Sequence, residues 1–167
     1  MKATEIKGLE VRVEGASEPA GTVSDLEFDL DRRVVTGICT VQEGRAPTYV
    51  LRPDDVRSVS EGVLHLQQGA APIPLSDSPA DRAAPTFNSL EDMDVMTETG
   101  RPLGTLSDVK IDVGDWSITQ YVVFEPYNEF NRNPMEVDAG LVSYGAQNLF
   151  VSESVALDWP RGPIASQ

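Results

Sequence analysis

The chain has 167 residues, enough for one domain or two small ones, and 40% of them are hydrophobic, so a folded core is expected rather than a disordered chain. It carries 13 Lys and Arg against 27 Asp and Glu, a net charge of -14, which argues against direct binding to nucleic acid or to anionic lipid. A single Cys and a single His argue against a disulfide framework and against a zinc site made by protein ligands alone.

No signal-peptide pattern follows Met1, and no run of about 18 apolar residues occurs in the sequence. We therefore expect a cytoplasmic protein with no membrane insertion. Cys39 lies in an apolar stretch and is expected to be a small buried residue.

The first elements in chain order are predicted strands. Residues 9–13 alternate apolar and charged side chains, the period of a half-buried strand. In the next strand, 21–30, alternation is interrupted, because Val23 precedes Leu26 by three residues instead of two. This break in parity predicts a β-bulge at Ser24–Asp25.

Short elements follow up to residue 68. Strands rich in Val, Ile and Thr are predicted at 34–42, near 48–51 and at 63–66. Pro53 opens a single helical turn, and no amphipathic helix of ten residues is visible. Four Pro and many Ala and Ser then predict a semi-extended linker over 69–87.

The second half repeats the first. Residues 104–113 match 21–30 at an offset of 83, with five of ten positions identical and four exchanging one apolar residue for another. The same parity break predicts a second bulge at Ser107–Asp108. Further strands follow in the same order, at 117–125, near 135–137 and at 149–152. The sequence therefore predicts a first domain over 1–68, a second over 88–159 and a loose tail over 160–167.

Four repeated residues are assigned to the bulges. Gly21 and Gly104 suit a sharp corner just before each bulge, and Asp25 and Asp108 are expected to accept hydrogen bonds from backbone donors that the bulge leaves unpaired. Bulges add the curvature that a small closed sheet needs. The predicted fold class is all-β, with two small, strongly curved β-barrels in tandem.

The repeated segments, Gly21-Thr22-Val23-Ser24-Asp25-Leu26-Glu27-Phe28-Asp29 and Gly104-Thr105-Leu106-Ser107-Asp108-Val109-Lys110-Ile111-Asp112, resemble the PRC-barrel family. Leu51-Arg52-Pro53-Asp54-Asp55-Val56 resembles its later turn of proline and acid, whereas the second copy lacks this proline. The resemblance implies a tandem member of small β-barrels, associated with protein interaction and without shared catalytic residues.

The residues predict no catalytic, cofactor-binding or metal site. His65 lies between Leu64 and Leu66, and no nucleophile is marked beside it. The aspartates at 29 and 31, and at 112 and 115, lack the spacing of a calcium-binding loop. We therefore expect a protein that is not an enzyme and that uses no cofactor.

The largest difference between the copies is a loop at 125–134, where the first copy has only 42–47. It places two aromatic residues among charged ones: Tyr127 and Phe130, with Glu125, Glu129 and Arg132. Either the aromatic rings fold back onto their own barrel, or they anchor a partner in a recognition loop.

The function that these observations favour is a non-enzymatic adaptor. It would bind another protein, or itself, through sheet edges and loops. The alternative is a small-molecule or metal-ion sensor with a site between the two barrels.

Overall fold

The computed structural model describes residues 1–42, 45–74, 84–124, 134–145 and 147–156. It is mostly β-strand, and the three described α-helices have four residues each. The predicted all-β class is confirmed. Contacts divide the chain into two compact units, the first formed by Met1–Asn88 with Ile111–Ser117 and the second by Ser89–Lys110 with Ile118–Gln167. Among the described residues, no helix combines the length and the hydropathy needed to span a bilayer.

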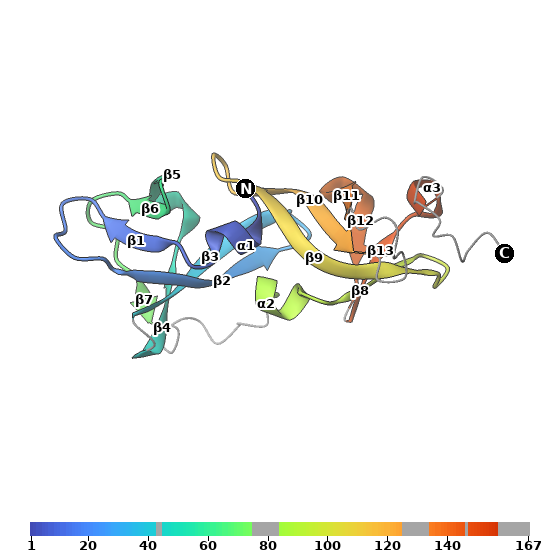
Figure 1. Ribbon diagram of the computed structural model, residues 1–167, viewed down its shortest axis with the longest axis horizontal. Coiled ribbons are helices and arrows are strands. Elements are labelled where there is room, and N and C mark those ends of the chain that lie inside the picture. Colours follow the sequence, from blue (N-terminus) through green and yellow to red (C-terminus); the bar gives the residue numbers. More distant parts are fainter. Residues whose placement is uncertain (43–44, 75–83, 125–133, 146, 157–167) are drawn as a thin grey trace. The chain divides into compact units, whose positions relative to one another are not determined.

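The described part of the first unit contains a short helix, seven strands and one 3-10 turn; Figure 1 labels the helix and the strands. They are α1 (Ala3–Ile6), β1 (Glu10–Val13), β2 (Gly21–Asp29), β3 (Val34–Gln42), β4 (Arg45–Leu51), η1 (Pro53–Asp55), β5 (Val56–Ser60), β6 (Val63–Leu66) and β7 (Ile73–Pro74). Hydrogen bonds join the strands in the order β7-β4-β3-β2-β1-β6-β5. β1 and β6 are parallel, and their neighbours are antiparallel. The described sheet is open, because this order does not return from β5 to β7.

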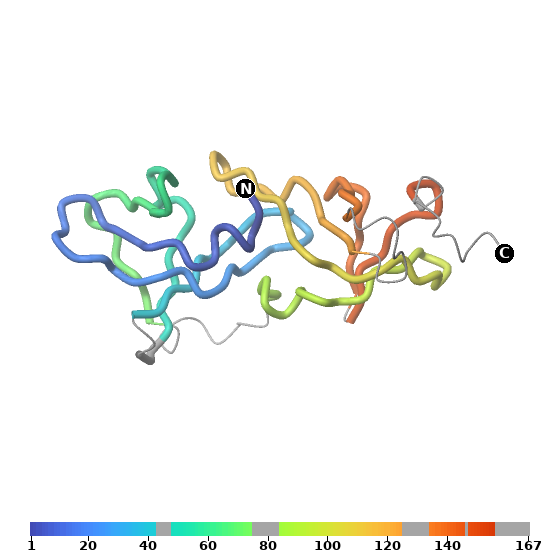
Figure 2. The backbone as a smooth tube through the Cα atoms, viewed as in Figure 1, coloured from blue at the N-terminus to red at the C-terminus, as the bar shows by residue number. Residues whose placement is uncertain are grey.

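β2 changes register where the parity break predicts a bulge. Val23 pairs with Thr40 and Asp25 pairs with Cys39, so that Ser24 is the extra residue. Val23 and Leu26 are both buried, although three positions separate them. The bulge therefore keeps both apolar side chains on the core face of one strand. The chain reaches β2 from β1 by turning back over residues 14–20 (Figure 2).

The described strands of the second unit follow the order of six of the seven described strands of the first. The second unit begins at Ser89, inside α2 (Phe87–Leu90). The elements that follow are β8 (Asp94–Thr97), β9 (Pro102–Asp112), β10 (Ser117–Phe124), β11 (Met135–Asp138), η3 (Ala139–Leu141), β12 (Val142–Tyr144), β13 (Asn148–Val151) and α3 (Glu153–Ala156). The order β11-β10-β9-β8-β13-β12 corresponds to β4-β3-β2-β1-β6-β5. β8 and β13 are parallel, as are β1 and β6. Leu106 and Val109 repeat the spacing of three between buried residues.

The segment Ile111–Ser117 belongs to the first unit. The N–H of Val35 donates to the carbonyl of Trp116 at 2.8 Å, and Ser117 pairs with Val34. Trp116 is buried and has a φ of 59°, while Arg33, 83 positions earlier, has a φ of 57°. The same left-handed turn thus recurs in both copies with different side chains.

Both described ends of the predicted linker contact the first unit. β7 pairs with β4, and the N–H of Phe28 donates to the carbonyl of Pro85 at 2.8 Å. Phe87, just beyond, is fully buried. Residues 75–83 and the tail 157–167 lie outside the described residues. The domain limits drawn from the sequence stay a prediction.

Candidate functional site

The two aspartates assigned to the bulges from the sequence hold backbone groups of their own strands. Oδ1 of Asp25 accepts from the N–H of Leu26, and Oδ1 of Asp108 accepts from the N–H of Val109, both at 2.8 Å. Asp25 also accepts from the N–H of Asn88 at 3.0 Å. Both carboxylates therefore act within the fold, in equivalent positions of the two copies.

Gly21 lies at a sharp corner of the backbone where no residue with a side chain fits. Its φ is 142°, and a Cβ built on it would lie 2.7 Å from the carbonyl oxygen of Val41. Gly104 has a φ of 153°, in the same region of backbone conformation. Both glycines provide a backbone conformation that residues with side chains rarely adopt, which allows each strand to bend at that position.

The exposed aspartates close turns. Oδ1 of Asp112 accepts from the N–H of Gly114 at 2.8 Å. Asp115 accepts from the hydroxyl of Ser117 at 2.7 Å and from its N–H at 3.0 Å, and these two bonds lower the pKa of the Asp115 carboxyl below its ordinary value. Among the described residues, no group of three or more His, Cys, Asp or Glu side chains is placed to hold a metal ion.

The loop predicted to recognise a partner lies outside the described residues, and this applies to all of its named side chains: Glu125, Tyr127, Glu129, Phe130 and Arg132. Its role stays a prediction. Phe124, the last described residue before it, ends β10 with its side chain exposed.

The edge strands of the two units differ in a way that sequence reasoning missed. β5 is bulged between Val56 and Ser58, and the exposed Arg57 at the bulge forms an ion pair with Glu14. A bulge and a charge are two of the features by which proteins protect a sheet edge from further pairing. β5 is therefore a protected edge.

β12 occupies the corresponding place in the second unit and carries neither feature. Its residues Val142–Tyr144 pair in unbroken register with β13, and none of them is charged. Tyr144 is 44% exposed, and Leu141, immediately before the strand, is 50% exposed. The available signal was the replacement of Val56-Arg57-Ser58 by Val142-Ser143-Tyr144, which loses a charge and gains an aromatic ring.

The second half of the sequence is acidic. Residues 88–167 contain 13 acids and 4 bases, a net charge of -9. α3 follows β13, the only strand paired with β12 in the described part of the chain, and begins with Glu153. Hydrogen bonds from the hydroxyls of Thr97 and Thr99 lower the pKa of the Glu153 carboxyl below its ordinary value.

The arrangement thus offers an uncharged strand edge, with two exposed apolar side chains, on an acidic unit. No family model matches the chain, and no curated protein matches it.

Proposed function

We propose that the chain is a protein-interaction module built from two copies of one small β-barrel domain of the PRC-barrel kind. Two observations support this proposal. The motif at 21–30 recurs at 104–113, and the strand orders of the two units correspond strand by strand, including the one parallel pair. Such short, curved domains expose edges and loops, which are the surfaces by which extended segments of partners are bound.

The observation that carries the interaction is the edge of β12, which has neither a bulge nor a charged residue of its own. An extended segment of another protein can add there as a further strand, because an edge presents backbone N–H and C=O groups along one side. Tyr144 and Leu141 supply apolar contact area beside the new strand. The acidic composition of the second half of the sequence favours a segment that carries Lys or Arg.

A second copy of this chain is the less suitable occupant. Each copy would bring its own excess of negative charge to the contact, since the whole chain has a net charge of -14. Like charges placed across an interface weaken association. The proposed partner is therefore a different protein with a basic, extended segment.

A selection from a library of random peptides tests this function. The full chain is immobilised, and enriched peptides are expected to alternate apolar residues with Lys or Arg. Replacing Leu141→Ala together with Tyr144→Ala should weaken their binding by on the order of 2 kcal/mol if both are hot spots.

Ile73→Ala is the matched control. Ile73 is 48% exposed and lies on β7, a short strand paired only with β4 among the described strands. The control should bind the selected peptides as the unmodified chain does. The proposed function would be contradicted if the selection enriches no basic sequences. It would also be contradicted if the enriched peptides bind the Leu141→Ala, Tyr144→Ala variant with unchanged affinity.

A further inference from the structure

One cavity on the first unit is lined by more basic than acidic side chains, unlike the chain as a whole. It has a volume of about 360 Å³ and is lined by Arg12, Val13, Glu14, Ala16, Arg57, Ser58, His65 and Leu66. The chain as a whole has twice as many acids as bases, yet this lining has two guanidinium groups and one carboxylate. It also contains the single histidine of the sequence. The volume lies in the range of pockets that bind small ligands.

Strand register brings these polar groups together from three places in the sequence. Arg12 on β1 pairs with His65 on β6, and His65 pairs with Ser58 on β5. Directly paired residues project from the same face of a sheet, so the three side chains form a row. This is the face opposite the core, because Val11 and Leu64, their neighbours in sequence, are fully buried.

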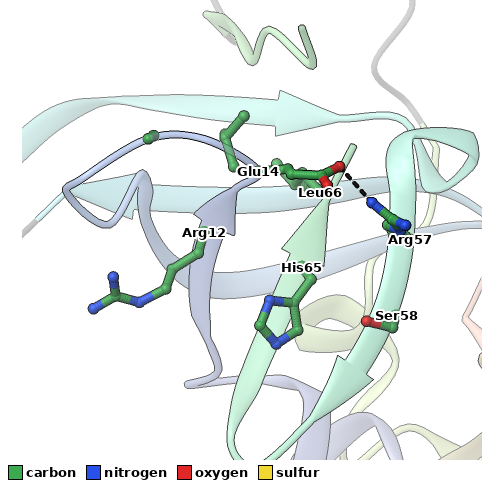
Figure 3. A pocket seen from close by; sticks show the side chains of 8 residues that line it. Arg12, Glu14, Arg57, Ser58, His65 and Leu66 are labelled. Carbon is green, nitrogen blue, oxygen red and sulfur yellow. Dashed lines mark ion pairs between the residues drawn. The ribbon is translucent and has the colours of Figure 1, made fainter. Parts of the chain in front are cut away.

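The bulge in β5 brings a fourth group to the same cavity. Val56 pairs with Leu66 and Ser58 with His65, which leaves Arg57 as the extra residue. Figure 3 shows Arg12 and Arg57 on either side of His65, with Ser58 beside the imidazole ring. The bulge that protects the edge thus also adds a second cation to the lining.

The guanidinium groups retain donors for a ligand. Arg12 contacts Glu10 at 3.0 Å through one nitrogen, and Arg57 contacts Glu14 at 2.5 Å through one nitrogen. A guanidinium has five N–H donors, and a hydroxyl and an imidazole can each donate one more bond. Ion pairs as exposed as these contribute little to stability, so a ligand can share or replace them.

From this lining we infer that the cavity binds the carboxylate of a small monocarboxylic acid with a compact apolar body. Arg12 and His65 hold the carboxylate, with Ser58 as a further donor. Val13, which is half-buried, and the exposed Ala16 supply apolar contacts for the body of the ligand. A dianion such as phosphate suits the site less, because Glu10 and Glu14 lie beside the two arginines and repel each added negative charge.

Proton NMR of the full chain tests the inference directly. His65 is the one histidine, so its ring resonances report on this site alone. At constant pH and ionic strength, benzoate should shift these resonances until they saturate. Benzamide, which has nearly the same shape without the charge, should not do so, and inorganic phosphate should bind more weakly than benzoate.

Arg12→Gln should weaken benzoate binding at least about tenfold, the effect of losing one charged hydrogen-bonding group. Arg32→Gln is the control, because Arg32 belongs to the same unit but does not line this cavity. Melting curves of both variants establish that they are folded. The inference is overturned if benzoate gives no saturable shift, if benzamide or phosphate binds as tightly, or if Arg12→Gln leaves the affinity unchanged.

Discussion

Gly21 shows how one backbone position can determine the path of a strand. Its φ is 142°, and the carbonyl oxygen of Val41 would lie only 2.7 Å from an added Cβ, so a side chain has no room there. Gly21→Ala should therefore reduce the free energy of unfolding by about 1–3 kcal/mol, measured by urea denaturation.

Gly140→Ala is the matched control, since a Cβ there would meet nothing within 4 Å. It should change the free energy of unfolding by less than about 0.5 kcal/mol. Equal effects of the two substitutions would show that the corner at Gly21 is not strained for other residues.

The aromatic residues Tyr127 and Phe130 provide a second test at the scale of single residues. If they anchor a partner, changing both to Ala should leave the melting temperature nearly unchanged and weaken partner binding by on the order of 2 kcal/mol. Binding is measured with the peptides selected on the unmodified chain. A sharp fall in melting temperature would instead show that the rings belong to the core of their own domain.

At the scale of elements, the bulge predicted at Ser107–Asp108 has a buried carboxylate beside it. Asp108 is 7% exposed, and its Oδ1 accepts from the N–H of Val109. Asp108→Ala should lower the free energy of unfolding by about 1–3 kcal/mol, because a buried backbone donor loses its partner. Asp94→Ala, at an exposed position on β8, should have little effect in the same denaturation experiment. If Asp108→Ala leaves the free energy of unfolding unchanged, the hydrogen bond from Val109 to this carboxylate does not stabilise the strand.

The long strands could be predicted from the sequence, while the edge strands could not. β3 spans the predicted residues 34–42, and β2 contains the predicted change of parity. In β5, Arg57 and Ser58 are adjacent and both exposed, so a bulged edge loses the alternation that identifies a strand. β12 has only three residues, too few to show a period.

Neither the edge of β12 nor the cavity lined by Arg12 and His65 could be predicted from the sequence, and the physical reason is a different one. Arg12, Ser58 and His65 are far apart in the sequence and meet only through the pairing of β1 with β6 and of β6 with β5. Alternation shows which face a residue occupies, but it does not show which strands are neighbours. The exposure of Tyr144 likewise depends on β12 being outermost in its sheet order.

At the scale of the whole molecule, the net charge of -14 should make stability depend on salt. Self-repulsion opposes the compact state, and dissolved ions screen it over about 10 Å at 0.1 M ionic strength. The melting temperature should therefore rise from low to moderate sodium chloride concentration in scanning calorimetry. A melting temperature that stays flat or falls would show that repulsion between carboxylates is not a major cost of folding.

The central claim is that the second unit binds an extended basic segment along β12. Hydrogen exchange of the full chain, with and without a peptide selected on it, measures this most directly. We expect slower amide exchange at Val142–Tyr144 in the complex, with exchange at the protected edge Val56–Ser60 unchanged. Binding along β12 would be contradicted if the peptide slows exchange at Val56–Ser60 but not at Val142–Tyr144. It would also be contradicted if the peptide changes no exchange rate in the second unit.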